Sequence, residues 1–283
     1  MRKTRILLLL LALSCGLLTA CGDKEEDLQV DLVGLGGDTW APTALDNWLS
    51  DNFVTPYNIE VKYRFDRYEV ALNRTLVPVK ESKVTLVMEA IRKTWIQPYE
   101  QQAGPHFIKK LSPKQFVLVG SPEYDPNNNT IKLGTAEGGR KVVLYKVNDF
   151  EPSNEAEVQR MLQTIHHEFG HILHQNILYP EDFKRISTDY TANWNDFSLA
   201  DARSRGYITT YARNNVDDDF VEMIAIMLTM GKADFDALVN STPESGRLLL
   251  RRKEEAVVRY FKQAWNIDLY ALQASTQAAI NAL

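Results

Sequence analysis

The chain has 283 residues, a formal net charge of −5 and two cysteines, Cys15 and Cys21. An acidic chain binds a phosphate backbone poorly, which argues against a nucleic-acid-binding protein. Both cysteines lie near the N-terminus, so the rest of the chain has no thiol for a disulfide and must be stabilised by a hydrophobic core.

The first 20 residues have the pattern of a secretory signal peptide. Basic residues at positions 2, 3 and 5 precede an apolar run over residues 6–13, which is too short to cross a membrane as a helix. The small residues before Cys21 resemble a bacterial lipobox, and this resemblance implies that Cys21 is the lipidated first residue of the mature protein. Lipidation there would anchor the protein to a membrane that it does not cross. Cleavage after Ala20 to give a plain secreted protein is the alternative.

An acidic tether is expected over residues 21–37. Removing residues 1–20 deletes three basic residues and no acidic ones, which takes the formal net charge from −5 to −8. Residues 22–27 are mostly charged and are predicted to be solvated. An acidic run after the cysteine resembles the surface-export signal of Bacteroidetes-type lipoproteins. It implies a lipoprotein of the bacterial outer membrane and leaves open whether the protein faces the periplasm or the cell surface.

Residues 38–283 are predicted to form a single domain with an N-terminal extension, because no Pro/Gly/Ser-rich break, internal repeat or low-complexity stretch divides them. Apolar and charged residues alternate over residues 59–65, which predicts a half-buried strand. A helix is expected over residues 82–97, and short strands over three segments, 115–119, 130–133 and 141–147. The segment 141–147 is the candidate edge strand, although a central strand suits its sequence equally well.

The most informative stretch is a predicted helix over residues 154–173. Asn154 is the expected N-cap, and Glu157 completes a capping-box pattern. Apolar residues then recur every three or four positions, as in a helix that packs on a core.

This helix carries the pattern H-E-x-x-H at His167, Glu168 and His171. Residues four apart lie on one face of a helix, so His167 and His171 suit one Zn2+, and the adjacent Glu168 suits a base that accepts a proton from the attacking water. A buried helix that contains histidines without a metal is the alternative. His166 points about 100° away from His167 and is assigned to packing or to the surface. His174 could flank the site, but it falls outside the usual ligand spacing.

The C-terminal half is predicted to be mainly α. Residues 181–210 are mixed and aromatic and are expected to form a loop and short helices over the site. Helical patterns follow at 217–230, 247–265 and 268–283. A catalytic zinc usually has three protein ligands, so the missing donor should come from a helix in this half.

An acidic cluster, Asp217, Asp218 and Asp219, opens the first of these helices. Successive residues on a helix are about 100° apart, so only one of the three can face a metal. Asp218 shares a face with Glu222. A solvated helix start with favourable dipole placement is the alternative explanation of Asp217 and Asp219.

The segment from Tyr211 to Glu222 resembles the third-ligand region of zincins of the lethal-factor type, whose pattern is Tyr-x-Arg-x-Asn-x-x-Glu-x-Phe-x-Glu. The matching residues are Tyr211, Arg213, Asn215, Phe220 and Glu222. Asp218 fills the ligand position in place of Glu, as in the aspzincins, and this departure leaves Asp218 or Glu222 open as the third zinc ligand. The resemblance implies that Tyr211 donates to the developing oxyanion and that Glu222 orients a ligand or supports its helix.

The whole chain is similar to the zinc-binding metallopeptidase lipoproteins found beside SusC/SusD-type nutrient importers. The resemblance implies an α+β, zincin-like catalytic domain over residues 38–283, with a short mixed sheet beside the HExxH helix. It also implies one Zn2+ per chain, a peptide or protein substrate, and an importer of the SusC/SusD type as a partner. Two other classes remain. One is a non-catalytic zinc-fold lipoprotein that binds an importer, against which the intact Glu168 and Tyr211 argue, and the other is a structural lipoprotein without metal.

Overall fold

The computed structural model describes residues 40–71, 73–125, 130–132, 134–137 and 140–283. The predicted signal peptide, Cys21 and the acidic tether all lie outside the described residues. Among those that are described, no helix combines the length and the apolar character needed to span a membrane. The segment Thr43–Leu283 forms one compact unit, and the elements below belong to it.

The N-terminal part of this unit is mostly helical. Its elements are α2 (Ala44–Leu49), η1 (Ser50–Val54), α3 (Thr55–Tyr57), β1 (Glu60–Lys62), α4 (Glu81–Ile91), η2 (Arg92–Ile96), α5 (Gln97–Ala103) and α6 (Pro105–Leu111). The strand predicted over 59–65 is confirmed in its centre only, as β1. The helix predicted over 82–97 is confirmed and runs on through a π-helical turn, η2, into α5.

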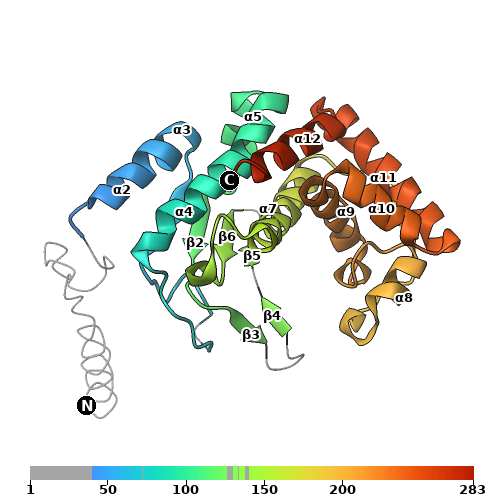
Figure 1. Ribbon diagram of the computed structural model, residues 1–283, viewed down its shortest axis with the longest axis horizontal. Coiled ribbons are helices and arrows are strands. Elements are labelled where there is room, and N and C mark those ends of the chain that lie inside the picture. The colour runs from blue at the N-terminus through green and yellow to red at the C-terminus, as the bar shows by residue number, and fades with distance from the viewer. Residues whose placement is uncertain (1–39, 72, 126–129, 133, 138–139) are drawn as a thin grey trace, which may run out of the picture. The chain divides into compact units, whose positions relative to one another are not determined.

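A four-stranded mixed sheet lies beside the helix Glu155–Asn176 (Figure 1). Its order is β1, β2 (Gln115–Leu118), β6 (Lys141–Leu144) and β5 (Gly134–Glu137). The first three strands are parallel, and β5 is antiparallel to β6. A separate antiparallel pair consists of β3 (Glu123–Asp125) and β4 (Thr130–Lys132). The predicted short mixed sheet is therefore confirmed.

The candidate edge strand is wrongly placed, because β6 lies between β2 and β5. Three successive residues of β6, Val142, Val143 and Leu144, are buried, which is the pattern of a strand covered on both faces. Among the described strands of this sheet, β1 and β5 form the two edges, and β5 is the edge strand next to β6. A Cβ at Gly134 would lie 2.1 Å from Cγ2 of Thr164, so only a glycine lets β5 run this close to the next helix.

That helix is α7 (Glu155–Asn176), which lies between the sheet and the C-terminal helices (Figure 1). Its predicted N-cap is confirmed, because the side chain of Asn154 accepts the N–H of Glu157. The capping box is only half formed. The carboxylate of Glu157 turns to Lys146 and Arg160, whose Nζ and Nη1 lie 3.1 and 2.5 Å from it.

Every regular element after β6 is a helix. Its elements are η3 (Val147–Asp149), α7, η4 (Phe183–Arg185), η5 (Trp194–Asp196), α8 (Leu199–Ser204), η6 (Tyr211–Arg213), α9 (Val216–Met230), α10 (Lys232–Ser241), α11 (Glu244–Trp265) and α12 (Leu269–Ile280). The short helices between α7 and α9 and the helical C-terminal half are confirmed. The helix α10 was not predicted. It begins at Gly231, whose φ of 76° ends α9 and turns the chain.

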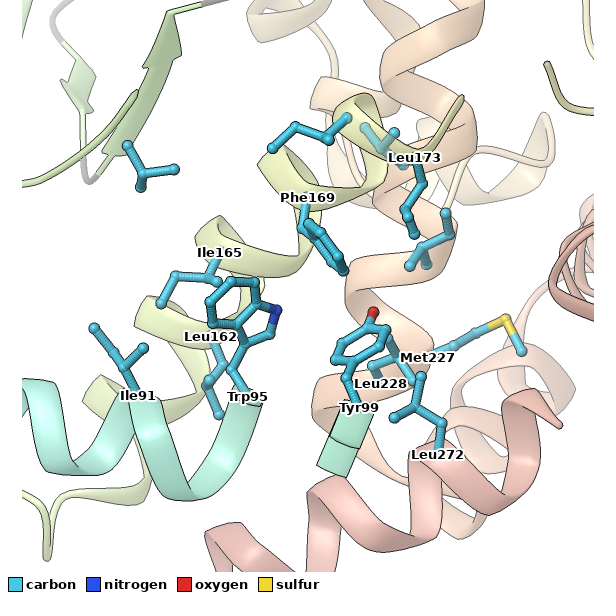
Figure 2. Packing of buried hydrophobic residues seen from close by; sticks show 14 of the residues in the cluster. Ile91, Trp95, Tyr99, Leu162, Ile165, Phe169, Leu173, Met227, Leu228 and Leu272 are labelled. Atoms are coloured by element: carbon cyan, nitrogen blue, oxygen red, sulfur yellow. The ribbon is translucent and has the colours of Figure 1, made fainter. Parts of the chain in front are cut away.

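The core fixes α7 from one side. Figure 2 shows Trp95 and Tyr99 against α7, beside Ile165 and Phe169. The ring of Phe169 meets those of Trp95 and Tyr99 edge-on, at centroid distances of 5.2 and 5.1 Å. Residues two apart on a helix point in nearly opposite directions, so His167 projects away from this aromatic contact.

Candidate metal centre

The two predicted histidines of α7 lie together. Nε2 of His167 is 3.2 Å from Nε2 of His171, and His167 is buried with 8% of its surface exposed. Glu168 lies beside them, and one ligand atom from each of the three residues falls within 4.8 Å of the others. His167 and His171 therefore lie on one face of α7, as their four-residue spacing predicts.

Asp218 reaches the same point from α9. Its Oδ1 lies 3.6 Å from Nε2 of His167 and 3.3 Å from Nε2 of His171. Its Oδ2 accepts hydrogen bonds from the side-chain amides of Asn214 and Asn215, at 2.6 and 2.7 Å. One carboxylate oxygen is therefore held by two amides, while the other faces both imidazoles.

These three donor atoms fit a zinc ion. Tetrahedral zinc with bonds of about 2.0–2.1 Å to nitrogen or oxygen separates neighbouring donors by about 3.3 Å. The two Nε2 atoms and Oδ1 of Asp218 are 3.2, 3.3 and 3.6 Å apart. Glu168 is a second carboxylate near the same point, with a ligand atom within 4.8 Å of both imidazoles.

Glu222 lies on the other side of the His167 ring. Nδ1 of His167 is 2.8 Å from Oε1 of Glu222. A carboxylate can only accept, so Nδ1 carries a hydrogen, and in the neutral ring Nε2 then has the lone pair that a metal requires. Oε2 of Glu222 accepts a hydrogen bond from the hydroxyl of Thr209 at 2.6 Å. Glu222 and Asp218 thus contact opposite edges of one imidazole.

His174 contacts the second imidazole, a role that its sequence position had left open. Nε2 of His174 lies 3.0 Å from Nδ1 of His171. Burial lowers the pKa of His174, and the neighbouring His171 lowers it further, although the charge of Asp217 opposes this. A neutral His174 can accept the Nδ1 hydrogen of His171 and so fix its orientation.

His166 belongs to the core, so the packing alternative is confirmed. It is fully buried, and its ring lies 5.9 Å from that of Tyr99. Burial lowers the pKa of His166 to about 3. Its ring packs in the core beside Tyr99, and His166 is not part of the group of side chains that could hold a metal.

Tyr211 comes from the short helix η6 and lies over the histidines. Its ring centroid is 5.6 Å from that of His167 and 5.0 Å from that of Trp194. Burial raises the pKa of the Tyr211 phenol, and the charges of Asp218, Glu168 and Glu222 raise it further. The phenol therefore keeps its proton and remains a hydrogen-bond donor.

Arg213 anchors the turn that carries Tyr211. Only 4% of Arg213 is exposed, and its guanidinium binds the carboxylates of Asp201 and Asp189 at 3.0 and 3.3 Å. Its Cζ lies 4.0 Å from the centre of the Phe197 ring. The sequence identified Arg213 only as a match to a family pattern, and the structure gives it this supporting contact.

The site favours a positive charge. Burial alone would lower the pKa of His167, but the carboxylates of Asp218 and Glu222 outweigh burial and raise it to about 10. For Asp218, burial opposes ionisation, yet contacts with His167, His171 and Asn214 hold the pKa of its carboxyl well below the usual range. The surrounding carboxylates therefore stabilise a cation among these side chains.

The alternative of a solvated helix start is wrong for Asp219, which is buried, whereas Asp217 stays partly exposed in the first turn of α9. Asp217 accepts a hydrogen bond from the phenol of Tyr179 at 2.5 Å. Asp219 is fully buried, and its Oδ2 lies 2.6 Å from Nζ of Lys253, also fully buried, and 3.0 Å from the phenol oxygen of Tyr190. A buried acid of this kind needs partners from elsewhere in the chain, which the local sequence could not reveal.

Gly170, between the two histidines, lets α7 and α9 approach each other. A Cβ at this position would lie 2.9 Å from Cγ1 of Val221 and 3.0 Å from its Cβ. This close packing sets Asp218 and Glu222 at the level of the imidazoles.

The fold and these side chains define a class: a mixed α and β domain in which two packed helices offer two imidazoles and a carboxylate to one cation. The chain belongs to the family described as putative zinc-binding metallo-peptidase, whose family model matches residues 38–270. It is also similar to the crystal structure of a putative zinc-binding metallo-peptidase from Bacteroides caccae ATCC 43185. The two are 32% identical with a TM-score of 0.72, and the match covers 84% of this chain and 91% of the other.

A comparison with curated proteins found no match. Membership of the family supports a zinc metallohydrolase and agrees with the donor set of the site.

Proposed function

We propose that the protein is a peptidase that uses one Zn2+ per chain, held by His167, His171 and Asp218. The observation that supports this most directly is the triangle of donor atoms, with sides of 3.2, 3.3 and 3.6 Å. Glu222 contacts the opposite edge of His167, which favours Asp218 over Glu222 as the third ligand. Glu222 then orients His167 and strengthens it as a ligand.

The reaction is hydrolysis of an amide. When bound, zinc acts as a Lewis acid that activates water and polarises a carbonyl. Glu168 accepts the proton that the attacking water loses as its oxygen bonds to the carbonyl carbon. The phenol of Tyr211 donates a hydrogen bond to the oxygen that gains negative charge. Glu168 then returns the proton to the amide nitrogen as the C–N bond breaks, which releases an amine and a carboxylic acid.

The edge strand β5 suits a peptide substrate. It is antiparallel to β6 and runs directly against α7. An extended peptide can pair with such an edge through main-chain hydrogen bonds. We assign this role to β5 in place of β6, which lies within the sheet.

The variant Glu168→Gln tests this function. It should retain one zinc per chain, measured by metal analysis of a fragment from residue 22 onward, and lose most hydrolysis of any peptide that the wild type cleaves. Glu155→Gln is the matched control, because Glu155 is exposed in the first turn of the same helix, and it should keep full activity. If the wild type binds zinc but cleaves nothing in a diverse peptide library, a zinc-fold lipoprotein that binds an importer becomes the better explanation.

We further propose that Cys21 is lipidated and anchors the enzyme to the outer membrane, where a SusC/SusD-type importer is its partner. The proposal is supported by the small residues before Cys21 and the acidic run after it. Cys21→Ala should release the protein from membranes and should not incorporate labelled fatty acid. Label in that variant would contradict the lipobox assignment.

A further inference from the structure

Thr209 links two parts of the candidate site by hydrogen bonds: Glu222, which contacts His167, and the turn that carries Tyr211. We propose that Thr209 is a positioning residue that couples the orientation of His167 to the location of Tyr211. This inference rests on the proposed function, and neither H-E-x-x-H nor the pattern around Tyr211 includes Thr209.

The hydroxyl of Thr209 makes two hydrogen bonds. Oγ1 donates to Oε2 of Glu222 at 2.6 Å and accepts the N–H of Ala212 at 3.1 Å. A threonine hydroxyl has one hydrogen and two lone pairs, so both bonds form at the same time. Because Glu222 accepts from Nδ1 of His167 at 2.8 Å, an unbroken chain of bonds runs from the imidazole to the backbone of η6.

Each link of this chain has a separate effect. Glu222 is buried, with 4% of its surface exposed, and each of its oxygens has one partner, His167 or Thr209. Removing the hydroxyl of Thr209 leaves one buried oxygen without its donor and frees the carboxylate to rotate. It also removes the bond to the N–H of Ala212, the residue after Tyr211, so the turn that carries the phenol loses this side-chain support.

The consequence is that the ligand and the oxyanion donor share one support. A shift of the Glu222 carboxylate changes the direction of His167, and a shift of η6 moves Tyr211 away from the developing charge. The hydroxyl of Thr209 bonds to Glu222 and Ala212 and not to any of the three donor atoms. Its effect passes through Glu222 and through the backbone of the turn.

The experiment compares Thr209→Val, which removes the hydroxyl at nearly constant volume, with Thr209→Ser, which keeps it. In Thr209→Val the zinc affinity, measured by competition with a chelator, should fall about 10-fold, the lower end of the effect of partners behind a metal ligand. The value of kcat should fall at least as much, with KM unchanged, and the visible spectrum of the cobalt-substituted protein should shift. Thr209→Ser should restore all three readouts.

A second comparison separates coupling through Glu222 from a local effect. In a Glu222→Ala background, Thr209→Val should cause little further loss of zinc affinity, because the link is already broken. Thr229→Val is the control. Thr229 is a buried threonine on α9 whose hydroxyl donates to the carbonyl of Ala225 at 2.7 Å, and its removal should leave zinc affinity and the cobalt spectrum unchanged.

Three results would overturn the inference. The first is a Thr209→Val enzyme with wild-type zinc affinity and kcat. The second is an equal loss of affinity with and without Glu222. The third is a Thr209→Ser enzyme as impaired as Thr209→Val. If the valine variant does not fold, the serine variant is compared with the wild type, and a loss of zinc affinity or kcat in it would also contradict the inference. A wild type that binds no zinc would instead refute the proposed function itself.

Discussion

The two imidazoles of the candidate centre have different surroundings. Behind His167 stand the carboxylate of Glu222 and the hydroxyl of Thr209, whereas His171 contacts the neutral ring of His174. The side chain of His167 is 10% exposed and that of His171 is 22% exposed. A charged acceptor makes a hydrogen bond about twice as strong as a neutral one. His167 is therefore the more firmly fixed imidazole and His171 the more adjustable one.

The largest loss of zinc affinity is expected from removing His167, the more firmly fixed imidazole. His167→Ala deletes a donor and also leaves Glu222 buried beside an empty space, so zinc binding should be abolished. Metal analysis of the purified fragment is the measurement. His106→Ala is the control, because this histidine is exposed and lies outside the site. Stoichiometric zinc in His167→Ala would exclude the site assignment.

The next largest losses of zinc affinity distinguish Asp218, the proposed ligand, from Glu222, the group that orients His167. Asp218→Ala should lose zinc outright, while Glu222→Ala should weaken binding by roughly 10- to 100-fold without eliminating it. Both are measured by chelator competition. If Glu222→Ala empties the site and Asp218→Ala leaves it filled, the ligand assignment on α9 is wrong by one helical turn.

The smallest effect is expected at His174. His174→Phe keeps a ring against Tyr179 and Phe220, which His174 contacts at 5.5 and 6.5 Å, but removes the acceptor for His171. Because the lost acceptor is a neutral ring and not a carboxylate, zinc affinity should fall by less than about 10-fold. A loss as large as that of Glu222→Ala would show that the two imidazoles are held equally firmly.

Much of the scaffold could be predicted because its signals are local. The cap at Asn154 and the apolar periodicity after it lie within one stretch of chain, and α7 follows them closely. The edge strand β5 could not be predicted in this way. Its sequence, Gly134–Glu137, has little strand character, and its place depends on pairing with β6 and on contact with Thr164.

In the candidate site, too, the features that depend on local sequence could be predicted, and those that depend on packing between helices could not. Helical spacing was enough to place His167 and His171 together, and to place Asp218 and Glu222 on one face of their helix. It could not tell which edge of the His167 ring each carboxylate contacts, because that depends on how α7 packs on α9. The contribution of Thr209 was missed for the same reason, since its partner Glu222 lies on a different element.

The close packing at Gly170 has a thermodynamic consequence. The donors lie on two helices, and about 50 residues of chain separate His171 from Asp218, a loop whose closure the unfolded chain rarely achieves. An unfolded chain cannot present all three donors together, so zinc affinity adds directly to folding stability by mass action. At free zinc about 1,000 times the dissociation constant, this linkage is worth about 4 kcal/mol. Chelators should therefore lower the melting temperature. They should also make the contact between α7 and α9 more sensitive to proteolysis. Thermal unfolding thus measures metal occupancy without a substrate.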